Sequence, residues 1–443
     1  MREDWIECKL EQISTGKNGI VDGPFGSNLK TSDYVKKGNG TVPVLTTKNL
    51  QGNYDDDSVR FISQEKFLEL KRSQVVPNDI IVAKIGSIGK NGIYPFNSPI
   101  AIIPANLLKF TVNDLVVLKY VHYFIKTYAF QATLKRISTA TAQPAFNVTK
   151  FRNLNIPLPP LPEQRGIVKK LESLFSSLDV GVADLKKAQQ QLKIYRQAVL
   201  KKAFEGEFVE VKFKELGDAI DPQPSHRTPP VDANGIPYVS IKDIVGNKLE
   251  LSKARLVSKN VLQEHLNRYT ILENDFIIGK IGTIGNPVKV HLPQNYTLSA
   301  NVVLIQPRKI NSNYLYYYFK SSNIEQQFNS GKKATTQAAF GIQKVRDLII
   351  RYPLDDSQQR KIVLDIETKL SVCDSIEQNI KESLAKAEAL RQSILKKAFE
   401  GNLLTAQELA ECKQAVDYEP ASVLLERIKA EQNKATPKHR KKK

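Results

Sequence analysis

The stretch RQAVLKKAFEG at residues 196–206 recurs as RQSILKKAFEG at residues 391–401, with two substitutions and an offset of 195. Such a long match between distant parts of one chain indicates an internal repeat. Four further pairs of blocks lie at offsets of 194 to 196: 42–53 with 236–247, 78–89 with 274–285, 120–126 with 314–320, and 140–154 with 334–348. The chain therefore consists of two copies of one unit, each a globular domain followed by a long helix.

The segments before the repeated endings have the apolar spacing of coiled coils. In the first copy, the 4-3 positions are Ile167, Leu171, Leu174, Leu178, Gly181, Leu185, Ala188, Leu192, Tyr195 and Val199. In the second copy they are Ile362, Ile366, Lys369, Cys373, Ile376, Ile380, Ser383, Ala387, Leu390 and Ile394. Heptads sustained in both copies predict that the two helices pair with each other. The spacing leaves their relative direction open, and two separate core helices are the alternative.

Residues at the ends of these helices carry boundary signals. Pro162 suits the first turn of the first helix, and Ser357 is predicted to cap the second. Gly206 and Gly401 are predicted to end the helices at matching places.

The globular segments read as mixtures of strands and helices. Residues 79–85 and 275–281 are predicted strands entered from an Asn-Asp turn, and residues 117–128 and 314–319 are predicted aromatic helices. The tail is predicted to form a short helix around residues 423–431 and a frayed basic end at 438–443. The expected divisions are 1–157 for the first domain, 158–206 for the first helix, 207–354 for the second domain, 355–401 for the second helix and 402–443 for the tail.

The charge of the chain is shared by the two domains. Of 443 residues, 65 are Lys or Arg and 46 are Asp or Glu, a net charge of +19. Residues 1–161 carry +7 and residues 207–354 carry +6. This surplus predicts a polyanionic partner, nucleic acid before an anionic membrane. The charged start, the lack of an apolar run near 18 residues and only three distant cysteines predict a cytosolic, soluble protein without a zinc cluster or a disulfide framework.

Motifs of catalysis are missing from the sequence. Residues 86–90 (GSIGK) are too short for a phosphate-binding loop, and no Asn/Asp-Pro-Pro-aromatic methyltransferase motif occurs. A nuclease metal site could be built on Asp79 with Lys84, or on Asp275 with Lys280. The second carboxylate that such a site requires is missing from both copies. The five histidines show no ligand spacing. Duplication of the aromatic helix favours core packing over base stacking.

Polar and basic loops that recur in both domains are the candidate DNA-binding sites, because their side chains can bond phosphates and base edges. A solvated surface is the alternative for each residue. The candidates are Ser27, Asn28, Lys30, Thr46, Lys48, Asn49, Lys84, Lys90, Thr139, Thr141, Gln143, Ser225, His226, Arg227, Lys242, Lys280, Thr283, Lys332, Lys333, Thr335 and Gln337.

The duplicated helices carry a family resemblance. Residues 158–165 (LPPLPEQR), the heptads, the paired LKKAFEG endings, residues 23–30 (GPFGSNLK), 81–89 (IVAKIGSIG) and 423–431 (VLLERIKAE) resemble the DNA-specificity subunit of type I restriction-modification systems. The second helix begins at 352–360 (YPLDDSQQR) and lacks the Pro-Pro of the first copy.

The resemblance implies a mixed α/β fold with two target-recognition domains, each reading half of a bipartite, asymmetric DNA site. It also implies antiparallel pairing of the helices. Catalysis would belong to partners: two modification subunits that use S-adenosylmethionine to methylate adenine, and two restriction subunits that use ATP and Mg²⁺. The chain itself would be non-catalytic and hold no cofactor. A coiled-coil scaffold that binds nucleic acid without sequence preference is the alternative function.

Overall fold

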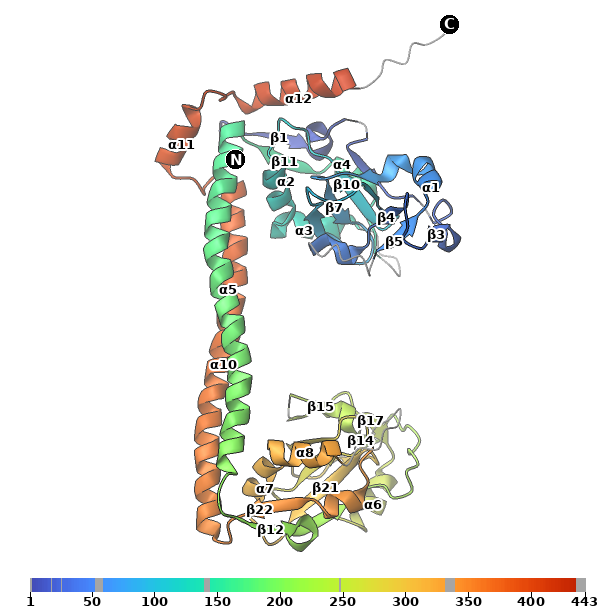
Figure 1. The fold of residues 1–443 in the computed structure, drawn as a ribbon, viewed down its shortest axis with the longest axis vertical. Helices are drawn as coiled ribbons and strands as arrows, with labels where there is room; N and C mark the ends of the chain where they lie inside the picture. The colour runs from blue at the N-terminus through green and yellow to red at the C-terminus, as the bar shows by residue number, and fades with distance from the viewer. Residues whose placement is uncertain are drawn as a thin grey trace. The chain divides into compact units, whose positions relative to one another are not determined.

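The computed structural model describes residues 2–16, 18–24, 26–51, 59–138, 144–246, 248–330 and 339–435. The chain forms two compact units (Figure 1). The first consists of Met1–Ala183 and Leu384–Lys443, and the second of Asp184–Ser383. Each unit contains one globular domain and one part of each long helix.

The first domain is a mixed α/β structure. Its strands are β1 Ile6–Lys9, β2 Ile20–Asp22, β3 Tyr34–Val35, β4 Val42–Val44, β5 Arg60–Ile62, β6 Gln74–Val75, β7 Ile80–Ala83, β8 Asn91–Ile93, β9 Ala101–Ile102, β10 Leu107–Phe110 and β11 Asn155–Leu158. Its helices are α1 Gln64–Glu69, α2 Leu118–Ile125, α3 Tyr128–Ile137 and α4 Val148–Arg152.

The second domain repeats this plan. Its strands are β12 Val209–Lys212, β13 Gly217–Ile220, β14 Ile236–Val239, β15 Ile244–Val245, β16 Lys248–Leu249, β17 Arg255–Val257, β18 Phe276–Gly279, β19 Gly285–Lys289, β20 Thr297–Leu298, β21 Val302–Pro307 and β22 Ile349–Tyr352. Its helices are α6 Lys259–Leu266, α7 Ser312–Tyr318, α8 Ser322–Ser330 and α9 Ile342–Arg346.

Two of the sheets have the same strand order in both domains, which confirms the repeat in three dimensions. The order β2-β10-β7-β8 corresponds to β13-β21-β18-β19, and the pair β1-β11 corresponds to β12-β22. In the central antiparallel ladders, Leu108 lies opposite Val82 and Leu304 lies opposite Ile277. The predicted strands are therefore confirmed as β7 and β18, and both are fully buried.

Both predicted strands begin at a left-handed asparagine. Asn78 has φ 71° and Asn274 has φ 69°, a conformation that asparagine tolerates better than most residues. The next residue in each copy, Asp79 or Asp275, accepts a backbone hydrogen bond of 2.8 Å that closes the turn. The Asn-Asp turn is thus the local cause of the strand entry.

The predicted aromatic helices are confirmed as α2 and α7, and they face the core. Tyr120, Tyr314 and Tyr318 are fully buried, and rings at the end of α10 and directly after α5 pack on them. The ring of Phe399 lies 5.1 Å from Tyr120, and the ring of Phe204 lies 5.1 Å from Tyr318. This packing joins each domain to the long helices within its own unit.

The two long helices pair antiparallel in each unit. They are α5 Leu161–Ala203 and α10 Asp356–Phe399, with 43 and 44 residues. In the first unit, Asp179 of α5 pairs with Arg391 of α10. In the second, Arg196 of α5 pairs with Asp374 at 2.6 Å. The partner number on α10 falls as the number on α5 rises, and the two ion pairs are repeat equivalents.

Most predicted pairing positions are buried or half-buried, namely Ile167, Leu171, Leu174, Leu178, Leu185, Leu192, Val199, Ile362, Ile366, Ile380 and Ile394. Tyr195, Ile376 and Leu390 do not lie in the seam, since their exposed fractions are 50%, 42% and 52%. The ion pairs explain this departure. The neighbouring residues Arg196 and Arg391 are half-buried instead and bind acids of the opposite helix, and Arg196 also binds Glu377 at 2.9 Å beside Ile376.

The helix boundaries follow the sequence signals with one correction. Pro162 lies in the first turn of α5, and Gly206 and Gly401, both at positive φ, follow the helix ends. Ser357 does not cap α10, because the helix already begins at Asp356. The carboxylate of Asp355 instead accepts hydrogen bonds from the Ser357 amide at 2.9 Å and from its hydroxyl.

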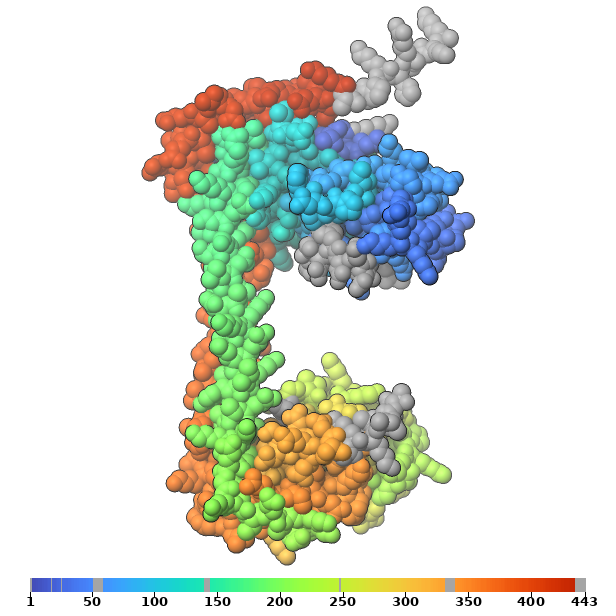
Figure 2. Space-filling model, in the orientation of Figure 1, coloured from blue at the N-terminus to red at the C-terminus, as the bar shows by residue number. Residues whose placement is uncertain are grey.

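The tail folds onto the first unit as two helices, α11 Ala406–Lys413 and α12 Ala421–Ala435. The second confirms and extends the predicted tail helix, whereas α11 was not predicted; the predicted frayed end lies outside the described residues. Figure 2 shows α11 and α12 in red beside the start of α5. Leu424, Leu425 and Ile428 belong to the same apolar core as Ile13.

Candidate nucleic-acid interface

A buried ion pair lies at the same place in both domains. Lys84, directly after β7, binds Asp22 at the end of β2 with an Nζ–Oδ2 distance of 2.6 Å. Lys280, directly after β18, binds Asp221 directly after β13, also at 2.6 Å. Because β2 and β7 flank β10, and β13 and β18 flank β21, each ion pair fixes the ends of two strands relative to each other.

The candidate loops begin at these ion pairs. Residues Ser27, Asn28 and Lys30 follow Asp22 and are exposed. Ser225, His226 and Arg227 follow Asp221 and are also exposed. The turns after the lysines carry the half-buried Lys90 in the first domain and the exposed Thr283 in the second. The structure therefore gathers the loop after Asp22 with the turn after Lys84, and repeats this arrangement in the second domain.

A third segment in each domain reaches the same place. The Phe146 amide donates to the Lys84 carbonyl at 3.2 Å, and the Phe340 amide donates to the Lys280 carbonyl at 2.8 Å. The candidates just before these phenylalanines lie outside the described residues: Thr139, Thr141, Gln143, Lys332, Lys333, Thr335 and Gln337.

Three candidates lie in the interior. Lys84, Lys280 and Asn49 have exposed fractions of 7%, 5% and 0%. The two lysines carry the ion pairs, and the side-chain oxygen Oδ1 of Asn49 accepts from the Thr46 amide and hydroxyl at 2.7 and 2.8 Å. Their geometry favours holding the loops over contacting a ligand directly.

The turn at Thr46 has a counterpart in the second domain. Asp243 accepts from the Ser240 amide at 2.7 Å and from its hydroxyl at 2.9 Å, as Asn49 does from Thr46. Lys48 and Lys242 project from these turns and are exposed, while Thr46 is half-buried. Each domain therefore presents a second exposed lysine on a fixed turn.

A buried histidine, which the sequence did not single out, organises the loop of the second domain. His265 of α6 is 1% exposed, and its Nε2 donates to the side-chain oxygen of Gln223. The Gln223 amide nitrogen donates to the Ser225 hydroxyl at 2.9 Å and to the Arg227 carbonyl at 3.1 Å. Burial lowers the pKa of His265 to about 4. The neutral ring thus fixes two candidate residues through one glutamine.

The repeated acids at the starts of the strands β7 and β18 have structural partners. Asp79 accepts from the Thr111 hydroxyl, and Asp275 accepts from the Gln306 amide. Burial raises the pKa of both carboxyls. Neither acid binds the lysine that follows its strand, so the arrangement favours a turn leading into a buried strand over a nuclease centre. In the described residues, no group of three His, Cys, Asp or Glu side chains could hold a metal ion.

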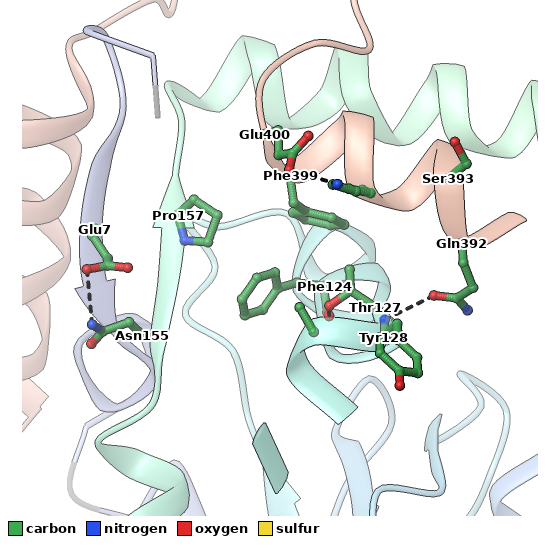
Figure 3. A pocket seen from close by; sticks show the side chains of 12 residues that line it. Glu7, Phe124, Thr127, Tyr128, Asn155, Pro157, Gln392, Ser393, Phe399 and Glu400 are labelled. Carbon is green, nitrogen blue, oxygen red and sulfur yellow. Dashed lines mark hydrogen bonds and ion pairs between the residues drawn. The ribbon is translucent and has the colours of Figure 1, made fainter. Parts of the chain in front are cut away.

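A cavity of about 780 Å³ lies on another side of the first domain (Figure 3). Phe124 and Phe399 line it together with Tyr128, whose exposed fraction is 77%. Gln392 holds its rim by accepting from the Tyr128 amide at 3.0 Å. No candidate DNA-binding residue is among its lining residues, so this cavity is separate from the loops at Lys84. Across the described chain, no helix has the length and apolar character needed to span a membrane.

Comparison with known proteins gives a family match in each copy. The family described as type I restriction modification DNA specificity domain matches residues 20–186 and 206–386. The EcoKI specificity subunit of Escherichia coli K12 is 25% identical over 97% of this chain and 96% of its own length. The StySPI specificity subunit of Salmonella potsdam is 24% identical, with the same two coverages.

A solved structure of a type I restriction-modification system contains a chain of similar fold. The TM-score is 0.68 with 17% identity, over 91% of this chain and 99% of that chain. At this identity the likeness concerns the fold alone, and it agrees with the two-domain, two-helix architecture described above.

Proposed function

The chain belongs to the family of type I restriction-modification DNA specificity subunits, and from this we propose that it reads a bipartite, asymmetric DNA site. The carrying observation is the repeated site: a buried Lys–Asp ion pair behind exposed polar loops in each domain. Similar scaffolds with different loop residues suit two half-sites of different sequence. The exposed residues Ser27, Asn28 and Lys30 would read one half, and Ser225, His226 and Arg227 the other.

Two recognition domains on one chain would give greater sequence selectivity than one domain alone. A domain that reads a few base pairs discriminates by roughly 1–3 kcal/mol for each mismatched pair. Two linked domains combine their selectivity when the connection restricts their separation. Paired helices of 43 and 44 residues are a stiffer connection than a flexible linker.

We propose that the chemistry belongs to partners. Two modification subunits would bring S-adenosylmethionine and methylate adenine at the site, and two restriction subunits would bring ATP and Mg²⁺ for translocation and cleavage. The specificity chain would bind DNA and position these subunits without a catalytic step of its own. Bending of DNA by the bound domains would ease extrusion of the target adenine into the methylating subunit.

A domain exchange tests this proposal. Residues 1–157 are replaced by the first domain of another specificity subunit, and the chain is expressed with its modification subunit. Long-read sequencing then maps the methylated adenines. We expect one half of the methylated motif to change and the other half to stay. A change in both halves, or in neither, would contradict modular reading.

Binding assays separate this function from the alternative of a scaffold without sequence preference. The modification complex is titrated with duplex containing the mapped motif, in the presence of excess random duplex at physiological salt. Specific reading predicts that motif DNA resists competition. If the random duplex displaces the motif duplex as readily as motif DNA does, and binding depends steeply on salt, the complex binds phosphates alone.

A further inference from the structure

A buried glutamine joins the start of each long helix to the domain that precedes it. Gln164 is the fourth residue of α5 and Gln359 the fourth residue of α10, and their exposed fractions are 0% and 3%. In the first copy, Oε1 of Gln164 accepts from the Val117 amide at 2.9 Å. Its Nε2 donates to the Pro159 carbonyl, also at 2.9 Å. Both ends of the side-chain amide are therefore used.

The second copy repeats these bonds. Oε1 of Gln359 accepts from the Asn311 amide at 2.8 Å, and its Nε2 donates to the Pro353 carbonyl at 2.8 Å. Val117 directly precedes α2, and Asn311 directly precedes α7. The two prolines lie between the last strand of each domain and the long helix that follows it. Each glutamine thus ties its helix both to the body of the domain and to the connection from it.

A tyrosine hydroxyl adds a third bond in each copy. Tyr120 of α2 donates to the Pro157 carbonyl in β11 at 2.7 Å, and Tyr314 of α7 donates to the Arg351 carbonyl in β22 at 2.9 Å. These strands lead directly into the long helices. We call the bonds of the glutamine and the tyrosine in each copy the domain–helix joint.

Directional bonds matter here because much of the remaining contact is apolar. The Phe399 ring packs on Tyr120, and hydrophobic attraction has no preferred direction. The ion pair of Lys119 with Glu172 between α2 and α5 is exposed and therefore weak. A hydrogen bond, by contrast, weakens steeply as its angle departs from linearity. Rotation of a domain on its helix would leave buried polar groups of the joint without partners, which is unfavourable.

Small rotations are important because the helices are long. The 43 residues of α5 span about 64 Å at 1.5 Å per residue. A rotation of about 3° of a domain on this helix moves the far helix end by about 3.4 Å relative to that domain. This displacement equals the rise of one base pair of DNA, about 3.4 Å. An exact spacing between two half-sites therefore requires that each domain be fixed on its helix to within a few degrees.

We infer that Gln164 and Gln359 are positioning residues that set the number of unread base pairs between the two half-sites, by fixing each domain on its own long helix. This inference rests on the proposed function, since only a bipartite site has a spacer. Neither glutamine contacts DNA in this role, so the bases read in each half-site should not depend on them.

The test measures spacer preference with the modification complex and competing duplexes. Each duplex holds both mapped half-sites, separated by the native spacer or by a spacer one base pair longer or shorter. Gln359→Leu keeps the approximate size of the side chain and removes both hydrogen bonds. We expect it to lower the ratio of native-spacer to altered-spacer affinity about tenfold, the combined effect of two ordinary hydrogen bonds. The base preferences within each half-site should stay as in wild type.

Two controls separate positioning from stability. Gln358→Leu is the matched control, because Gln358 is the exposed neighbour in the same helical turn, and it should keep the wild-type ratio. Ile271→Ala removes buried apolar atoms from a cluster of the second domain that contains no residue of the joint. It should lower stability and keep the ratio. An equal change of the ratio in Ile271→Ala would overturn the inference, because destabilisation alone would then explain it.

Wild-type ratios in both Gln359→Leu and Gln164→Leu would also overturn the inference. If neither variant folds, as judged by circular dichroism, Tyr314→Phe removes a single hydroxyl from the joint and should lower the ratio by a smaller factor; an unchanged ratio would then be the contradicting result. A wild-type complex without any preferred spacer would contradict the proposed function itself. A wild-type preference that all joint variants retain would contradict only the role of the joint.

Discussion

The Lys280–Asp221 ion pair couples the stability of the second domain to the position of its loops. The two side chains are 6% and 16% exposed, so water does little to compensate either charge. Loss of one partner from a buried pair leaves the other charge without compensation, which costs about 3–5 kcal/mol.

We therefore expect Asp221→Ala to lower the free energy of unfolding of the second domain by about 3 kcal/mol or more. The control is Asp218→Ala, which breaks the exposed pair with Arg308, with side chains 56% and 45% exposed. That change should cost at most about 1 kcal/mol. The stability losses of both variants are measured by chemical denaturation, with hydrogen exchange of β18 as the probe of the second domain. Equal losses for the two variants would refute a structural role of the buried Lys280–Asp221 pair.

His265 gives the second domain a dependence on pH. Its pKa of about 4 in the folded protein lies below the ordinary value of 6.5, so folding favours the neutral ring. The stability that this preference contributes is fully present above pH 6.5 and is lost as pH falls toward 4. Since the neutral ring also fixes Gln223, acid should loosen the loop at Ser225.

Between pH 6.5 and pH 5, we expect wild type to lose about 2 kcal/mol more stability in the second domain than His265→Gln does. Thermal denaturation at both pH values measures the difference. His291→Gln is the control, because the His291 side chain is exposed and the hydrogen bonds of this residue with Tyr296 are made by its backbone. A His265→Gln variant as sensitive to acid as wild type would exclude His265 as the titrating group.

At the scale of the element, the seam of the long helices distinguishes two isoleucines on α10. Ile380 has an exposed fraction of 5%, and Ile376, one turn earlier, has 42%. Both satisfy the heptad pattern, but the ion pairs of Arg196 with Asp374 and Glu377 occupy the helix contact near Ile376.

Ile380→Ala should lower the free energy of unfolding by about 2–4 kcal/mol, since it opens a cavity in a buried contact. Ile376→Ala, with identical chemistry, should cost less than about 1 kcal/mol. Urea denaturation of the full chain compares them. A larger loss for Ile376→Ala would contradict this prediction and support the regular heptad pattern, in which Ile376 lies in the seam.

The sequence could predict the elements that repeat. The strands β7 and β18 and the helices α2, α7, α5 and α10 each have strong local signals that occur twice. The shorter strands, such as β3 and β9 with two residues each, are too short to show periodicity. The seam departures depend on a cross-helix ion pair, which heptad spacing does not reveal.

The candidate site could be predicted in part, because its loops also occur twice, between repeated elements. Loops between repeated elements pointed to exposed residues such as Ser27 and Arg227. The partners Asp22 and Asp221 were missed, although they lie at the ends of the corresponding strands β2 and β13, because their contact with the lysines spans about sixty residues of chain. His265 gave no signal, since its role depends on Gln223 from a different loop.

At the scale of the whole molecule, the tail is part of the first domain. The side-chain amide of Gln432 donates to the carbonyls of Gln12 and Ser14 at 3.1 and 2.6 Å. Leu424 is fully buried in the core that also contains Ile13, and Lys170 binds Glu408 at 2.8 Å.

Leu424→Ala should therefore destabilise the first unit by about 2–5 kcal/mol and leave the second unit unchanged. Hydrogen exchange resolved by peptide measures each unit separately, with β10 and β21 as equivalent reporters. Val423→Ala is the control, because Val423 is 46% exposed. Equal protection of β10 in both variants would show that the tail adds nothing to the first domain.

The division of the chain between the two units also sets the order in which they can be completed during synthesis. The second unit is a continuous segment, Asp184–Ser383, whereas the first needs both Met1–Ala183 and Leu384–Lys443. A ribosome adding about 5–20 residues per second would finish the tail roughly 15–50 s after Ala183. The domain that emerges first is thus the last to be finished, and during that interval its tail-binding surface is open to chaperones, to proteases and to the tail of a neighbouring nascent chain.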